Sequence, residues 1–197
     1  DTIAGGTGTD TLTATLGNES VRPTISGVET IKLTSSADTT TIDTRDITGT
    51  TTYSLESSDA AIVLNYLSAV PTLTLNTHTD DVTANFTDAA LAGSADSMTI
   101  NVNNVTQAGG ETITVTDAGG TTNKLETIVV NSASLASVVG DLVTTGVGTT
   151  TLSVTGDADL TFTNAIDTAI TTVSAADFTG DLSLTAGTTL TAVSVTT

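Results

Sequence analysis

The sequence contains no cysteine and no tryptophan, and only two prolines, two tyrosines and three phenylalanines among its 197 residues. The lack of cysteine excludes disulfides, thiolate metal sites and cysteine nucleophiles. The scarcity of aromatic residues argues against a large globular core, whereas a narrow core of aliphatic ladders needs none. No apolar run approaches the roughly twenty residues of a membrane helix, so we expect no membrane insertion.

Positive charge is also scarce. The chain has four lysines and arginines against 22 aspartates and glutamates, which gives a formal net charge of −18. Nucleic acids and anionic membranes bind through basic patches, so neither is an expected partner. Such acidity favours a divalent cation, which would relieve the repulsion between carboxylates on folding. The alternative is that the acidity serves only solubility.

Threonine is the commonest residue, and it alternates with apolar residues in many short runs. Threonine, valine and isoleucine favour strands, and this alternation is typical of a strand with one buried face. The first apolar residues of successive runs recur at intervals of about ten residues. Because each interval holds a strand and a turn, two of them form a coil of about twenty residues. These first apolar residues are Ile31, Ile42, Tyr53, Ile62, Leu73 and Val82.

Divergent internal repeats support a stack of such coils. Residues 28–49 align without a gap with residues 125–146, and both segments contain an apolar residue followed by Glu-Thr-Ile. DITG at 46–49 resembles DFTG at 177–180. Internal repetition is the signature of a solenoid. The sequence therefore predicts an all-β fold, a right-handed parallel β-solenoid or β-roll of nine or ten irregular coils of about 20 residues each. The alternative is one or two β-sandwich modules.

Three segments give more local predictions. Residues 87–97 could hold a single helical turn. Residues 134–143 have apolar residues at helical spacing, but the internal repeat indicates strands there. Two Gly-Gly pairs bracket residues 112–117, which predicts one strand between two turns.

The candidate metal site lies at the start of the chain. Gly5 to Thr13 matches the nine-residue pattern G-G-x-G-x-D-x-U-x, in which U is a large aliphatic residue. This pattern builds a parallel β-roll that binds calcium. In it Asp10 would supply a carboxylate, while Gly5, Gly6 and Gly8 would expose backbone carbonyls. Asp1 would belong to a preceding copy.

Calcium needs six to eight oxygen ligands, so this stretch cannot complete a row of sites alone. The simpler interpretation is a glycine-rich turn that leads into a strand, with Asp10 in an Asx turn. Asp157 and Asp159, in the segment GDAD, are a second pair of candidate calcium ligands. Aspartate is also a common turn residue, which is the simpler interpretation of that segment.

An enzymatic function is not expected. The only histidine, His78, lies near Asp80 and Asp81, but no nucleophile motif accompanies it, and a solvated loop histidine is the simpler interpretation. With two lysines and two arginines, a polysaccharide lyase site is difficult to build. We therefore predict no catalytic residues and no organic cofactor.

The threonine-rich runs raise one further possibility, since a flat threonine array on a solenoid can order water and bind ice. The T-x-T motifs at 72–74, 112–116 and 149–151 do not recur at one fixed period. The sequence therefore argues against a regular array.

The nonapeptide at 5–13, GVETIKLT at 27–34 and DFTGDLSLT at 177–185 together resemble Gram-negative bacterial surface-layer proteins with RTX-type calcium-binding repeats, which are exported by type I secretion. The resemblance implies an extracellular protein on the bacterial cell surface that assembles with itself into a calcium-dependent two-dimensional lattice. A segment outside this sequence would bind cell-surface polysaccharide. The alternatives are a segment of an RTX adhesin or secreted array and, third, a carbohydrate-active β-helix. We expect a fragment of a longer chain, with the end of an RTX-like β-roll at 1–27 and an irregular solenoid at 28–197.

Overall fold

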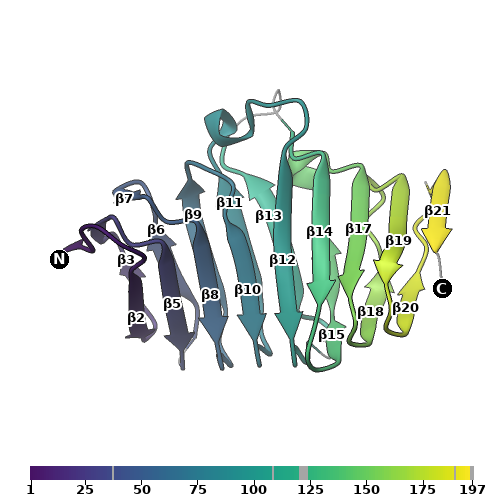
Figure 1. Cartoon of the computed structure of the whole chain (residues 1–197), viewed down its shortest axis with the longest axis horizontal. Coiled ribbons are helices and arrows are strands. Elements are labelled where there is room, and N and C mark those ends of the chain that lie inside the picture. The colour runs from purple at the N-terminus through teal and green to yellow at the C-terminus, as the bar shows by residue number, and fades with distance from the viewer. Residues whose placement is uncertain (37, 108, 120–123, 189, 196–197) are drawn as a thin grey trace.

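The computed structural model describes residues 1–36, 38–107, 109–119, 124–188 and 190–195. It is all-β, with 3% helix, and its parallel sheets stack as a β-solenoid of about 8 turns (Figure 1). The predicted parallel β-solenoid is thus confirmed. The turns are fewer than the expected nine or ten because two coils in the middle of the chain are longer, with equivalent residues 27 and 30 positions apart.

The broadest layer is a nine-stranded parallel sheet that runs the whole length of the solenoid, from β2 near the N-terminus to β21 near the C-terminus (Figure 1). Its strands are, in stacking order, β2 (Thr11–Leu16), β5 (Thr30–Ser35), β8 (Thr52–Glu56), β10 (Thr72–Asn76), β12 (Ser97–Asn103), β14 (Thr127–Ser132), β17 (Thr151–Gly156), β19 (Thr172–Phe178) and β21 (Ala192–Val195).

Three smaller parallel sheets form the other sides. The six-stranded sheet contains β3 (Ser20–Val21), β6 (Thr40–Asp43), β9 (Ile62–Leu67), β11 (Val82–Phe86), β13 (Thr112–Asp117) and β16 (Asp141–Val143). One three-stranded sheet contains β1 (Thr2–Ala4), β4 (Thr24–Ser26) and β7 (Ile47–Thr48). The other contains β15 (Ser137–Val139), β18 (Leu160–Ala165) and β20 (Leu182–Thr185).

Aliphatic ladders fill the interior. Because side chains alternate across a strand, every second residue points inward and meets its equivalent in the next coil. The predicted ten-residue interval is a step from one sheet to another, since Ile31 lies in the nine-stranded sheet and Ile42 in the six-stranded sheet. One continuous ladder of the nine-stranded sheet consists of Leu12, Ile31, Tyr53, Leu73, Ile100, Val130 and Val154.

The coils differ in length, and the additional residues lie in the turns. Equivalent residues of paired strands in neighbouring coils are between 19 and 31 positions apart. The turn after β11 contains the short 3-10 helix η1 (Asp88–Leu91), which projects beyond the strand ends at the top of Figure 1. A second, η2 (Thr145–Val147), follows β16. The helical turn expected in 87–97, the strand at 112–117 and the strands at 134–143 are all confirmed.

The two copies of the Glu-Thr-Ile motif begin strands of the same sheet, but they occupy different places in the ladders. Ile31 stacks in line with Val130, whereas Ile128 lies two residues earlier. An even shift keeps each residue on its own face of the sheet. Farther along, Ile42 lies in β6 and Val139 in β15, which belong to different sheets. Residues 28–49 and 125–146 therefore resemble each other because the Glu-Thr-Ile of each begins a strand of the nine-stranded sheet.

Candidate metal site

The glycine-rich segment forms the turn between β1 and β2. Gly6 and Gly8 have φ values of +91° and +129°, a conformation that side chains rarely adopt. No other residue lies within 4 Å of where a Cβ would be at either position. Their place in the motif is thus explained by backbone conformation, and this turn leads directly into the strand that begins at Thr11.

Gly5 is required by packing between coils. A Cβ at Gly5 would lie 1.8 Å from the carbonyl oxygen of Gly27, the corner residue of the next coil. The Gly5 amide donates to the Ser26 carbonyl oxygen (2.9 Å), and the Gly27 amide donates to the Thr48 carbonyl oxygen (3.2 Å). Gly5 and Gly27 are therefore corners at which successive coils stack in direct contact.

Asp10 stands at the start of β2 and contacts Glu29 of the next coil. The Asp10 amide donates to Glu29 Oε2 over 2.7 Å, and the Asp10 carbonyl accepts the Thr30 amide over 3.1 Å. Asp10 Oδ2 is buried and has no hydrogen-bond partner. A buried carboxylate oxygen normally has a partner, so this atom is the strongest indication of a missing ligand in the motif.

The same arrangement recurs deeper in the solenoid. The Asp96 amide donates to Glu126 Oε2 over 2.8 Å, and the Asp96 carbonyl accepts the Thr127 amide over 3.1 Å. In both copies of Glu-Thr-Ile, the glutamate carboxylate thus accepts a hydrogen bond from the backbone amide of the aspartate that stands just before the neighbouring strand. Sequence reasoning found the repeat but missed this role of Glu29 and Glu126, because their partners are 19 and 30 residues away.

The residues of the motif fit only part of a calcium site. The Glu29 carboxylate contacts Asp10 through the Asp10 backbone amide, whereas calcium takes six to eight oxygens. Asp1 is exposed and lines the open end of the core. Within the described residues, no group of three or more His, Cys, Asp or Glu side chains could hold a metal ion. The remaining ligands of a calcium ion here would be backbone carbonyls and water.

The second candidate pair, Asp157 and Asp159, lies in the exposed turn between β17 and β18. Asp159 Oδ1 accepts the Asp181 amide of the following coil over 2.9 Å, and the Asp157 amide donates to the Ser132 carbonyl over 3.0 Å. These contacts join successive turns, which is the role expected of aspartate as a turn residue.

A further pair of carboxylates faces a shallow pocket beside β16. Burial raises the pKa of Asp141, and the nearby Asp167 raises it further. Asp167 is itself engaged, because its Oδ2 accepts the Thr144 amide over 2.7 Å and its Oδ1 accepts the Ala169 amide over 3.0 Å. The position of Asp167 is therefore accounted for by the turn that it closes.

The expectation of a solvated histidine was wrong. His78 is fully buried, and neither of its ring nitrogens has a hydrogen-bond partner. Burial lowers its pKa, against the opposing effect of Asp80 and Asp81. Asp81 Oδ1 accepts the Thr112 amide over 2.6 Å. His78 is thus a core residue.

Most of the few cations form ion pairs. Arg22 Nε lies 2.7 Å from Asp46 Oδ2, and Lys32 Nζ lies 3.4 Å from Glu56 Oε1. Arg45 pairs with Asp43 and stacks over the Tyr66 ring at 4.4 Å. The Arg45 guanidinium lowers the pKa of Asp43 to about 2. These pairs lie on the surface of the early coils and leave no exposed, unpaired arginine.

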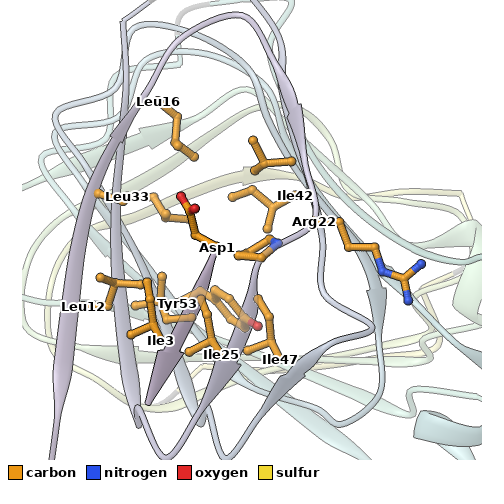
Figure 2. A pocket seen from close by; sticks show the side chains of 14 residues that line it. Asp1, Ile3, Leu12, Leu16, Arg22, Ile25, Leu33, Ile42, Ile47 and Tyr53 are labelled. Carbon is orange, nitrogen blue, oxygen red and sulfur yellow. The ribbon is translucent and has the colours of Figure 1, made fainter. Parts of the chain in front are cut away.

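The N-terminal end of the core is open. A cavity of about 340 Å³ is lined by aliphatic side chains of the first coils (Figure 2). Ile3, Leu12 and Leu16 point into it and are only partly buried, whereas Arg22 points away. Tyr53 closes the inner side of the cavity, where burial raises its pKa above the usual range. This end is an apolar surface continuous with the core.

Two further observations complete the description. No helix within the described ranges is long and apolar enough to cross a membrane. In comparisons with known proteins, no family model, no curated protein and no solved structure matches the chain.

Proposed function

We propose that this chain is a structural protein of the bacterial cell surface, which assembles with copies of itself into a two-dimensional lattice. The observation that carries the proposal is the glycine-rich nonapeptide at 5–13, which forms the turn leading into the first long strand of a parallel β-solenoid of about 8 turns.

The stacked ladders support a mechanical role. Each coil contacts its neighbours along whole strands, so the solenoid resists bending and can hold its two ends at a fixed separation.

Calcium dependence is part of the proposal. The nonapeptide at 5–13 supports it, as does the unpartnered Oδ2 of Asp10 next to Glu29. When bound there, calcium would neutralise two neighbouring carboxylates of a chain with a net charge of −18.

Electron microscopy of the purified protein tests the proposal. We expect ordered sheets with millimolar calcium, their loss on chelation and their return when calcium is restored. An Asp10→Asn variant should need more calcium, whereas an Asp59→Ala variant, altered at an exposed turn residue, should behave as the parent. Cell attachment by a protein that remains monomeric would favour the adhesin instead, and turnover of a polysaccharide would favour the carbohydrate-active β-helix.

A further inference from the structure

The outward face of the nine-stranded sheet is an ordered array of small polar side chains. The first of its columns consists of threonines that lie side by side on consecutive strands: Thr11, Thr30, Thr52, Thr72 and Thr99. The same column continues as Val129, Ser153, Ser174 and Ser194. We call the outward residues of β2, β5, β8, β10, β12, β14, β17 and β19 the hydroxyl face.

Sequence periodicity did not predict this array, and the structure explains why. The T-x-T motifs are irregularly spaced along the chain because the coils differ in length. Those differences are taken up in the turns and the other sheets, while the nine-stranded sheet keeps one register from β2 to β17 and shifts between Ser153 and Thr155, where β17 meets β19. Of the motifs noted in the sequence, 72–74 lies on the hydroxyl face and 112–116 lies in β13 of the six-stranded sheet.

The spacing of the array follows from strand geometry. Outward residues on one strand are two positions apart, about 6.7 Å, and neighbouring strands lie about 4.8 Å apart. A second column, Ser97, Thr127, Thr151 and Thr172, runs parallel to the first. The hydroxyls therefore form a near-rectangular lattice rather than a single row.

The columns differ in what their polar groups contact. In one column, Asn101 Nδ2 donates to Thr74 Oγ1 and Asn131 Nδ2 donates to Asn101 Oδ1, at 3.2 Å and 3.0 Å. These bonds fix the side chains and the strand spacing. The threonines of the first column make no side-chain hydrogen bond within the described residues, so their hydroxyls are available to an external partner.

Charge is nearly absent from this face, although the chain as a whole is strongly acidic. Among the outward residues of β2 through β17 in this sheet, only Lys32 and Glu56 are charged, and they pair with each other at 3.4 Å. On β19, Asp177 is exposed and lies beside Thr155. The outward residues of β2 through β17 include no aromatic side chain. A surface with so little charge does not complement an ion, a nucleic acid or a charged membrane.

From these observations we propose that the hydroxyl face binds the surface of ice. Protein interfaces depend on aromatic and arginine anchors, and sheet surfaces that bind crystalline polysaccharide use exposed aromatic rings, neither of which this face offers. Ice presents a neutral lattice of hydrogen-bonding oxygens whose repeat distances are close to those of the array. Ordered water over the threonines would join this lattice without loss of hydrogen bonds. The inference is independent of lattice assembly.

Adsorption of the folded protein to a growing ice crystal, together with its freezing hysteresis, tests the inference. The Thr72→Tyr variant places a bulky ring in the first column and should lose most of both signals. Its matched control is Thr83→Tyr, which alters an outward, partly buried threonine of β11 on the six-stranded sheet and should retain them. Circular dichroism establishes that both variants are folded.

Three results would overturn the inference. The first is that the folded parent protein does not adsorb to ice. The second is that Thr72→Tyr adsorbs as well as the parent, or that Thr83→Tyr loses adsorption equally. The third is that the parent binds crystalline cellulose or chitin in place of ice, which would assign the face to a polysaccharide.

Discussion

The first coil, residues 1–27, and the interior coils between β8 and β19 share ladder residues and corner glycines. The ladder residues differ in how deeply they are buried. Leu12 and Leu73 stand in one ladder, but Leu12 is only partly buried whereas Leu73 is completely enclosed. Gly5 and Gly156 both sit where a Cβ would meet the backbone of the next or previous coil. The most recognisable sequence motif thus lies in a coil whose ladder residues are only partly buried, and the plainer threonine-rich runs form the core.

This difference shows that motif clarity and structural importance are separate properties. The glycines of the first coil are conspicuous because positive φ and close approach demand glycine. Ladder positions accept any largely apolar side chain of suitable volume, so Ile31, Tyr53 and Leu73 share one ladder. The comparison leads to four predictions.

The largest effect is expected in the shared ladder. Leu73→Ala should lower the free energy of unfolding by about 2–5 kcal/mol, because it leaves a cavity among fully buried neighbours. Leu12→Ala should cost less than half as much, since its side chain already borders the open end. Urea denaturation followed by circular dichroism measures both. Equal losses would show that the first coil is packed as tightly as the interior.

The corner glycines should come next. Gly156→Ala should destabilise by about 1–3 kcal/mol, because its Cβ would lie 1.9 Å from the Ser132 carbonyl oxygen and its φ is +106°. Gly5→Ala meets Gly27 at a similar distance but in a coil that is free to shift on one side, so its cost should be smaller. Gly110→Ala, where a Cβ meets nothing within 4 Å, is the control. The same urea denaturation decides the order, and a larger loss at Gly5 than at Gly156 would contradict the prediction.

The twin carboxylates provide a finer comparison. Glu126→Ala should cost about 1–3 kcal/mol, since it leaves the Asp96 amide without its acceptor. Glu126→Gln retains an acceptor oxygen and should cost less. Without calcium, Glu29→Ala in the first coil should lower the free energy of unfolding by the same amount as Glu126→Ala. With calcium it should lower it by more, because the Glu29 carboxylate then also faces the ion. Identical behaviour of the two alanine variants with and without calcium would remove Glu29 from the proposed site.

The smallest effect should appear in the pH dependence of stability. Burial lowers the pKa of His78 in the folded state, so only the unfolded chain takes up its proton as the pH falls below about 6.5. Stability should therefore be constant above that pH and decline below it, before the carboxylates titrate. His78→Gln should flatten the decline between pH 7 and pH 5 in denaturation measurements. A decline of the same size in the variant would assign the proton uptake to other groups.

Much of the fold could be predicted because its signals are local. Alternation in runs such as Thr72–Asn76 reports a strand with one buried face, and the interval between Ile31 and Ile42 reports the step between sheets. The role of Glu29 could not be predicted, because its partner Asp10 becomes a neighbour only when coils stack. The burial of His78 was hidden for the same reason, since a polar stretch with two aspartates resembles a solvated loop.

By itself, the sequence determined the class of structure: alternating threonine and aliphatic residues favour strands, and their recurrence requires a repetitive parallel stack. The tertiary structure decided the register of that stack. Coil length, measured between equivalent residues of paired strands, varies from 19 to 31 residues, so no period in the chain shows which side chains become neighbours. Hydrogen bonding between parallel strands fixes those neighbours instead, and it aligns Thr11, Thr30, Thr52 and Thr72 into one column while longer turns bulge elsewhere.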